Sequence, residues 1–182
     1  MNFTRCCVFV LLCISNIYKI QGYNFNACPT SKNNVLNVTY GSLVVKCGTK
    51  YDLELVTPDP PNISFSHADK EKFYEVLMID PDASKCRSWL HMLLSDVKGS
   101  DLQNGISANV NTGFNVVTEY MSPGPPKGAG YHRYIQAAFG HEEPLNLEKI
   151  TQRCGFDIDL FSITHNLHLI PDANNMFKTQ TK

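Results

Sequence analysis

Hydrophobic and polar residues alternate along much of the first third of the chain. The segments Val35–Tyr40 and Tyr51–Val56 place an apolar residue at nearly every second position, which is the pattern of strands with one buried face. Three later segments, Phe73–Ile79, Trp89–Leu94 and Tyr131–Phe139, are more continuously apolar. Such runs predict central strands that are buried on both faces.

A helical period occurs in one later segment. Phe156, Leu160, Ile163 and Leu167 recur every three to four residues, and Asp157 stands where an N-cap or first-turn acid belongs. This spacing predicts a short amphipathic helix that buries these four apolar side chains.

The remaining segments are loops and a polar tail. Pro and Gly are concentrated at residues 57–61 and 122–130, which indicates loops, and the residues from about 171 onward carry little apolar content. We expect that tail to be loosely ordered. Many strands with few helices predict a mainly β protein built as an antiparallel sandwich.

The N-terminus has the pattern of a secretory signal peptide. Arg5 precedes an apolar run over residues 6–14, and a polar stretch follows up to Gly22. The run is far shorter than the roughly 20 residues of a transmembrane helix. We therefore expect a signal peptide over residues 1–22, a single domain over 23–182, no transmembrane segment and a secreted, soluble product.

Four cysteines and two glycosylation sequons fit an exported chain. Beyond the signal peptide the cysteines are Cys28, Cys47, Cys86 and Cys154. An even number in an exported chain predicts two disulfides, whose pairing the sequence leaves open. Their spacing does not match a structural zinc site. Asn37 and Asn62 begin Asn-X-Thr and Asn-X-Ser sequons, so both are candidate glycosylation sites.

The charge is close to balanced. Lys and Arg number 16 and Asp and Glu 17, without a basic stripe, so nucleic-acid binding is disfavoured. The apolar content suffices for one core, so the expected state is a monomer.

Polar residues gather at two strand ends. Asp80-Pro81-Asp82-Ala83 follows an apolar strand, and Pro81 stops that strand from continuing in the ladder, which holds Asp80 at a rigid corner. Strand alternation places His91 on the same face as Trp89. Taken alone, these residues suit a purely structural role at least as well as a binding site. The aspartates would cap a turn, the histidine would be hydrogen-bonded within the core, and the tryptophan would anchor the core.

A rigid loop precedes a second polar group. Residues 122–130 read SPGPPKGAG, and Tyr131, His132, Arg133 and Tyr134 follow at once. This loop is not a nucleotide P-loop, because the spacing is short and two prolines lack the N–H that a phosphate needs. On the opposite strand face from its neighbours, Arg133 suits a structural ion pair as well as a ligand contact.

Three stretches of the sequence resemble the signatures of the phosphatidylethanolamine-binding protein family. They are the string Asp80-Pro81-Asp82-Ala83, the pair Trp89 and His91, and above all GPPKGAGYHRY over residues 124–134. The resemblance runs from about residue 35 to about 169. It implies a Greek-key β-sandwich with a few short peripheral helices and a small anion-accepting pocket at one end.

Position by position, the resemblance implies that Asp80, His91, His132 and Tyr134 line this pocket, with Gly124 and Pro125 as one wall. Histidine and tyrosine donors suit a phosphate, and Asp80 can orient a histidine or accept from an ammonium group. The expected ligand is a phospholipid headgroup such as phosphatidylethanolamine, or a similar organic phosphate, without a cofactor. A metal site at Asp80, Asp82, His91 and His132 is disfavoured, because such clusters more often satisfy one another.

The chain departs from the family pattern in three places. Ser84 replaces a proline, Leu90 replaces a histidine that would add an imidazole at the pocket mouth, and a sparse tail replaces a helical C-terminal extension. The signal peptide, cysteines and short tail look most like the secreted members of the family.

Two other functions stay open. One is a protein-level regulator, for instance an extracellular protease inhibitor or a modulator of signalling. The other is a hydrolase in which His91 or His132 activates Ser84 or Ser122, although the sequence lacks a Gly-X-Ser-X-Gly elbow. Solvated side chains without a role are expected for the remaining histidines, which are His67, His141, His165 and His168.

Overall fold

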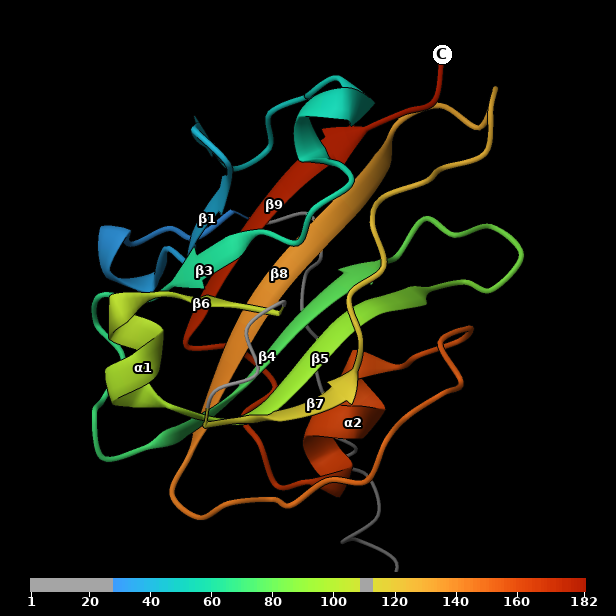
Figure 1. Cartoon of the computed structure of the whole chain (residues 1–182). Helices are drawn as coiled ribbons and strands as arrows, with labels where there is room; N and C mark the ends of the chain where they lie inside the picture. The colour runs from blue at the N-terminus through green and yellow to red at the C-terminus, as the bar shows by residue number, and fades with distance from the viewer. Residues whose placement is uncertain (1–27, 109–112) are drawn as a thin grey trace, which may run out of the picture.

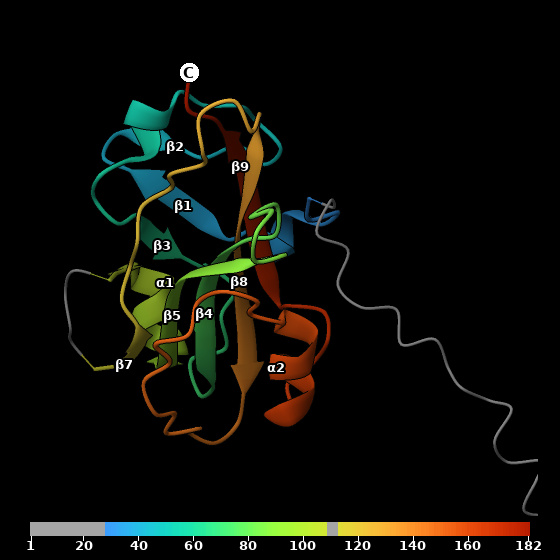
Figure 2. The same ribbon diagram turned by 90° about the vertical axis from the view of Figure 1, so that its right-hand side faces the viewer.

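The chain folds into two antiparallel sheets that face each other (Figures 1 and 2). The computed structural model describes residues 28–108 and 113–182, and the predicted signal peptide lies outside them. The smaller sheet has the order β2-β1-β3-β6 and the larger one β7-β5-β4-β8-β9. The smaller sheet contains β1 (Asn37–Tyr40), β2 (Leu43–Val44), β3 (Asn62–Ser64) and β6 (Ile106–Ser107). The larger sheet contains β4 (Phe73–Asp80), β5 (Trp89–Lys98), β7 (Asn115–Thr118), β8 (His132–His141) and β9 (Ala173–Thr179).

The larger sheet has Greek-key connectivity. Strands β4, β5 and β7 follow one another side by side, and β8 returns to pair with β4, which gives the order β8-β4-β5-β7. Three successive antiparallel neighbours and a fourth strand beside the first define a Greek key. Between β5 and β7 the chain passes through α1 (Gly99–Asn104) and β6 of the other sheet. The predicted mainly β sandwich is confirmed.

Apolar side chains form a layer on each face of the larger sheet. Between the two sheets lie Val38, Tyr40, Val76, Met78 and Phe177, among others. On the outer face, α2 (Ile158–Thr164) packs against the sheet (Figure 2), and that layer includes Leu77, Ile79, Phe139, Ile158 and Phe161. Strand β4 lies in the middle of its sheet and is buried on both faces, as its continuous apolar run predicts.

The predicted strand at Tyr51–Val56 is wrong. Residues Leu53–Val56 form a 3₁₀ helix instead, in which the Leu55 N–H donates to the Asp52 carbonyl at 3.1 Å. The Thr57 hydroxyl donates to the Leu53 carbonyl at 2.9 Å and closes the turn. Alternation over six residues fits a strand and a short turn equally well, and long-range pairing decides between them.

The predicted helix exists, but it buries a different face. Asp157 is the N-cap, and its carboxylate accepts from the Leu160 N–H at 3.0 Å, as expected. Leu160 and Ile163 are 60% and 52% exposed, whereas Phe161 is buried. With seven residues the helix makes about two turns, so the predicted stripe is longer than the helix that carries it.

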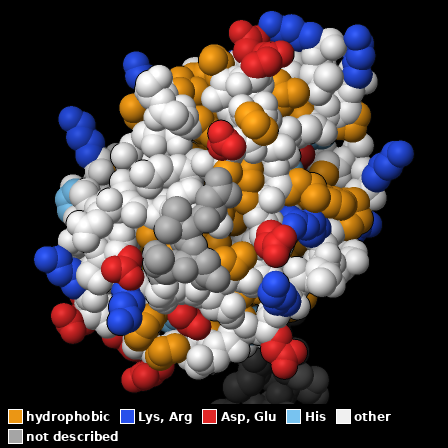
Figure 3. Space-filling view, in the orientation of Figure 1, with side chains coloured by type: hydrophobic (Ala, Val, Ile, Leu, Met, Phe, Trp, Pro, Cys, Tyr) orange, Lys and Arg blue, Asp and Glu red, His pale blue; other side chains and the backbone are white. Residues whose placement is uncertain are grey.

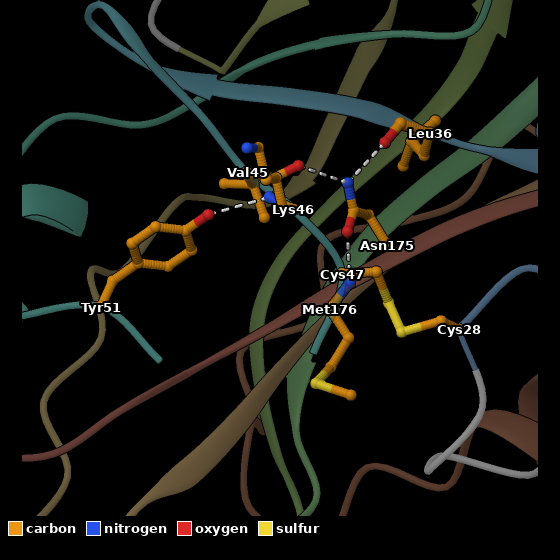
Figure 4. The surroundings of a disulfide bond; sticks show 8 residues. All are labelled: Cys28, Leu36, Val45, Lys46, Cys47, Tyr51, Asn175 and Met176. Atoms are coloured by element: carbon orange, nitrogen blue, oxygen red, sulfur yellow. Dashed lines mark hydrogen bonds between the residues drawn. A yellow bond between two sulfur atoms is a disulfide. The ribbon is translucent and has the colours of Figure 1, made fainter. Parts of the chain in front are cut away.

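The expectation of a loosely ordered tail from about residue 171 is also wrong. Strand β9 pairs with β8 over seven residue pairs and is almost entirely buried. Asn175 connects it to the first part of the chain (Figure 4): its amide donates to the carbonyls of Leu36 at 2.9 Å and Val45 at 3.3 Å. Buried asparagines that bond to the backbone make this strand look polar in sequence.

Two disulfides form, and the structure supplies the pairing that the sequence left open. Cys28 bonds to Cys47, beside β9 (Figure 4), and Cys86 bonds to Cys154. Among the described residues, no helix is long and apolar enough to cross a membrane. On the face drawn in Figure 3, Lys and Arg side chains are scattered rather than gathered into a stripe.

Candidate ligand-binding pocket

A cavity of about 380 Å³ lies where β4 ends and where β5 and β8 begin. It collects residues from the β4–β5 connection, the loop before β8 and the first residues of β8. All six predicted binding residues line it, namely Asp80, His91, Gly124, Pro125, His132 and Tyr134. The other lining residues are Ala83, Ser84, Lys85, Cys86, Trp89, Met121, Ser122 and Pro126.

Asp80 and His132 form a buried pair on neighbouring strands. His132 Nδ1 lies 2.7 Å from Asp80 Oδ2, and both side chains are about 5% exposed. A carboxylate only accepts when ionised, so Nδ1 carries the proton and Nε2 is the ring nitrogen available to a ligand. The second Asp80 oxygen accepts from the Asp82 N–H at 2.8 Å, which fixes the corner after β4.

A β-bulge presents His91 to the same cavity. Ile79 pairs with Leu90 and Met78 with Met92, so His91 is the extra residue of β5. Its Nδ1 lies 2.7 Å from the Met121 carbonyl, which again leaves Nε2 for a ligand. Burial is the largest influence on its imidazole and holds the pKa below the usual value of 6.5.

Tyr134 forms the buried floor between the two histidines and β9. Its ring meets His91 edge-on at 5.2 Å and stacks on Phe177 at 5.3 Å. Burial, and then the negative charge of Asp80, raise the pKa of its hydroxyl, while a backbone hydrogen bond with Gly124 opposes this shift. Tyr134 therefore offers a neutral O–H group.

Arg133 points away from the cavity and stabilises its frame. Its side chain forms two hydrogen bonds to the Asp82 carboxylate, at 2.8 Å from Nε and 2.6 Å from Nη2. The Arg133 backbone N–H adds a third at 2.9 Å. Burial raises the pKa of Asp82, but these Arg133 contacts outweigh it and lower the pKa overall. The ion-pair interpretation of Arg133 holds, and the pair joins the corner after β4 to β8.

The β4–β5 connection forms one wall and is held by a disulfide. Ser84, Lys85 and Cys86 all line the cavity, and Cys86 is bonded to Cys154. The Leu90 N–H donates to the Arg153 carbonyl at 3.0 Å, close to this bond. Ser84, which replaces a proline of the family pattern, therefore lies on this wall, and Lys85 adds a cation there.

The structure decides between the alternatives for Trp89 and corrects the expectation for Leu90. Trp89 is partly exposed and lines the cavity rather than anchoring the core. Leu90 is fully buried in the layer beneath α2, on the other face of the sheet from the cavity. The replacement of a histidine by Leu90 therefore does not alter the lining of the pocket.

Sequence reasoning missed the residues that hold the pocket from behind. Arg153 donates to the carbonyls of Leu90 and His91, each at 3.1 Å, and to that of Glu119 at 2.8 Å. Met121 supplies its carbonyl to His91. The acceptors in these contacts are backbone carbonyl oxygens, which every residue has. The contacts therefore cannot be predicted from the pattern of side chains.

One of the remaining histidines also departs from expectation. His67 and His168 are exposed, as predicted, and His165 is half-buried beside Phe161 with their ring centroids 4.8 Å apart. His141, by contrast, lies 3.2 Å from the buried carboxylate of Glu75. The expectation that His141 is a solvated loop residue is therefore wrong.

The chain matches the family profile of the phosphatidylethanolamine-binding protein over residues 31–170. It belongs to the phosphatidylethanolamine-binding protein family. A relative from Drosophila melanogaster, "Putative odorant-binding protein A5", is 32% identical over 126 residues, which is 63% of this chain and 55% of the relative. The match thus spans about half the length of that relative.

Solved structures share the fold at lower identity. The phosphatidylethanolamine-binding protein from Plasmodium vivax superposes with a TM-score of 0.67 at 18% identity, covering 85% of this chain and 91% of the other. A carboxypeptidase Y inhibitor, solved in complex with its cognate proteinase, gives 0.66 at 24% identity, covering 82% and 84%. At these identities, the likeness establishes that the phosphatidylethanolamine-binding fold is shared.

Proposed function

We propose that this protein is secreted and binds a small phosphorylated ligand, such as the phosphoethanolamine headgroup of a phospholipid, without turning it over. The observation that carries the proposal is the orientation of two imidazoles in one cavity. Each uses Nδ1 for a protein contact, to the Met121 carbonyl or to Asp80, and is left with Nε2 for a ligand. Both histidines and Tyr134 line the same 380 Å³ space.

The chemistry of these groups suits a phosphate. When protonated, His91 and His132 donate from Nε2, and the neutral Tyr134 hydroxyl adds a third donor. The contact between His132 Nδ1 and Asp80 holds the imidazole ring in place. Lys85 adds a positive charge at the wall. Charge-assisted hydrogen bonds of this kind are the strong ones in anion recognition.

The other lining residues suit the rest of such a ligand. Trp89, Met121, Pro125 and Pro126 supply apolar surface around the polar group. A pocket with a few placed polar groups and an apolar wall is typical of small-ligand sites. Asp80 lies close enough to the histidines for its charge to attract an ammonium group on the same ligand.

Secretion is part of the proposal. Two disulfides support it, because such bonds persist in oxidising compartments. Both sequon asparagines, Asn37 and Asn62, are exposed and so are accessible to glycosylation.

Binding is proposed in preference to hydrolysis. Asp80 and His132 are paired as in a catalytic triad, but a serine nucleophile must also hydrogen-bond to the imidazole. Within residues 28–108 and 113–182, neither Ser84 nor Ser122 makes that bond. We expect no release of product from a chromogenic acyl or phosphate ester, and turnover that disappears in Ser84→Ala or Ser122→Ala would reverse this choice.

A protein-partner role is the alternative. The carboxypeptidase Y inhibitor of similar fold was solved together with a proteinase. In this chain the loop that borders the cavity is exposed from Pro126 to Tyr131, so a partner could contact it directly. If this protein inhibits a carboxypeptidase and does not bind phosphate ligands, the protein-partner role is favoured.

Calorimetry with phosphorylethanolamine tests the proposal. We expect saturable binding by the protein, at least a tenfold weaker affinity for His132→Ala, and no change for the exposed control His168→Ala. The tenfold loss corresponds to about 1.4 kcal/mol, close to the lower end of the range for one hydrogen bond to a charged group. Ethanolamine and inorganic phosphate, titrated separately, show which half of the ligand is recognised. Equal affinity in all three proteins would contradict the assignment of the pocket.

A further inference from the structure

We propose a divalent cation site of the zinc class, formed by Glu75, Asp96 and His141 at the opposite end of the larger sheet from the ligand pocket. The three side chains each offer one ligand atom, and these atoms lie within 4.8 Å of one another. They come from the start of β4, the end of β5 and the end of β8. None of them contributes to the pocket around Asp80 and His132.

Glu75 provides the independent observation that points to a ligand. Its side chain is fully buried, yet one carboxylate oxygen, Oε2, has no hydrogen-bond partner among the described residues. The other oxygen accepts from the Ser95 hydroxyl at 2.7 Å and the Asp96 N–H at 3.1 Å. Leaving a buried carboxylate oxygen unpaired costs free energy, which a bound cation removes.

His141 is oriented as metal-binding histidines are. Its Nδ1 lies 2.9 Å from the Glu143 carbonyl, an oxygen that can only accept, so Nδ1 carries a proton. Nε2 then faces Glu75 Oε1 at 3.2 Å. In zinc sites the ligating histidine almost always donates its other ring N–H to a carbonyl or carboxylate, which fixes the ring and directs its lone pair at the metal.

The backbone places Asp96 at the same point. Tyr74 pairs with Val97 and Val76 with Leu94, so Ser95 and Asp96 together oppose Glu75 in a β-bulge. The Asp96 carboxylate accepts from the backbone N–H groups of Leu145 at 2.7 Å and Asn146 at 3.0 Å. These bonds hold the carboxylate beside the buried Glu75 and close the loop after β8 over the site.

The charges call for a cation. The two carboxylates carry two negative charges, and in the described part of the chain neither acid pairs with Lys or Arg. One imidazole with two carboxylates suits Zn²⁺ better than Ca²⁺, which takes oxygen ligands alone. In a tetrahedral zinc site the ligand atoms lie about 3.4 Å apart at the usual bond lengths, so side-chain movements of about 1 Å are needed to complete the site.

The test measures zinc binding to the disulfide-bonded protein by calorimetry. It also measures the melting temperature of the protein at increasing zinc concentrations. We expect one Zn²⁺ per chain, a melting temperature that rises with zinc concentration, and much weaker binding of Ca²⁺. His141→Gln and Asp96→Asn should each weaken zinc binding by at least tenfold. Asp96→Asn keeps a residue that tolerates the left-handed backbone found there, with φ at 58°.

Two controls locate the ion. His168→Gln changes an exposed histidine outside the cluster, and His132→Ala changes the ligand pocket, whose two histidines could themselves attract zinc. Both should bind zinc as the wild type does. No binding by the wild type, unchanged binding in both cluster variants, or loss of the ion in His132→Ala would each overturn the proposal. Melting curves without zinc identify any variant that fails to fold.

Discussion

At the scale of single residues, the pocket depends on how each ring nitrogen is used. The motifs around Asp80, His91 and His132 carry enough information to predict that these side chains meet, because their order and separation are specific to the family. They do not carry the acceptor for His91, which is the Met121 carbonyl. Glu75 is a charged residue inside the apolar run of β4, and this position alone could have indicated a special role. The sequence analysis treated it only as part of a strand.

The buried His91 makes stability depend on pH. Burial lowers the pKa of its imidazole in the folded protein, so the unfolded chain binds the proton more readily. The contribution of His91 to the free energy of unfolding is fully present above about pH 6.5, which is the pKa of a histidine in the unfolded chain. It is lost as the pH falls from there toward the lower pKa that His91 has in the folded protein. The slope for this single group is at most about 1.4 kcal/mol per pH unit.

Denaturant unfolding of the wild type and of His91→Gln over this pH range measures the effect. The variant cannot titrate at that position, so its free energy of unfolding should fall less steeply below about pH 6.5 than that of the wild type. Identical slopes would show that His91 is not buried in its neutral form.

At the level of helices and strands, the sequence predicts those elements that form because their apolar residues must be buried. It does not predict those that depend on hydrogen bonds to distant strands. Strands β4, β5 and β8 were predicted because continuous apolar runs need burial on both faces. Strand β9 was missed because Asn174 and Asn175 look like loop residues until the backbone that surrounds them is known. The 3₁₀ helix at Leu53–Val56 shows the reverse error, since alternation alone is compatible with a turn.

The Cys86–Cys154 disulfide should support both stability and binding. It joins residues 68 apart, so its loss should cost up to about 4 kcal/mol through the entropy of the unfolded chain. It also anchors the β4–β5 connection that lines the cavity. Replacing both cysteines by alanine should lower the denaturation midpoint and weaken binding of phosphorylethanolamine.

The other disulfide is the matched control. Cys28 and Cys47 are 19 residues apart and do not line the cavity. Their replacement should cost about 3 kcal/mol at most and leave ligand affinity in the folded protein unchanged. Equal affinity losses for the two double variants would mean that the Cys86–Cys154 wall has no special role in binding.

At the scale of the whole molecule, the features that could be modified and the features that could bind lie on different parts of the sandwich. Asn37 and Asn62 belong to β1 and β3, which pair in the smaller sheet with Asn37 opposite Ser64. The ligand pocket and the Glu75 cluster lie at the two ends of the larger sheet. The sequence predicted the sandwich and the sequons but not this separation, which depends on the order of the strands.

Glycosylation should therefore be independent of ligand binding. Protein secreted from eukaryotic cells should shift in two steps on treatment with a glycosidase, and Asn37→Gln and Asn62→Gln should each remove one step. Neither substitution should change the affinity for phosphorylethanolamine, because both asparagines lie on the smaller sheet. A secreted protein without any shift would contradict the use of these sequons.

In the proposed function, imidazole N–H groups hold the phosphate, and ¹⁵N NMR of the histidine side chains detects whether they do. With phosphorylethanolamine bound, the titration midpoint of His91 should rise, because the ligand favours the protonated ring. The His132 Nε2 resonance should shift in the same titration, while those of the exposed His67 and His168 stay unchanged. Saturable binding that leaves His91 and His132 unperturbed would show that these histidines do not hold the phosphate and would place the ligand elsewhere.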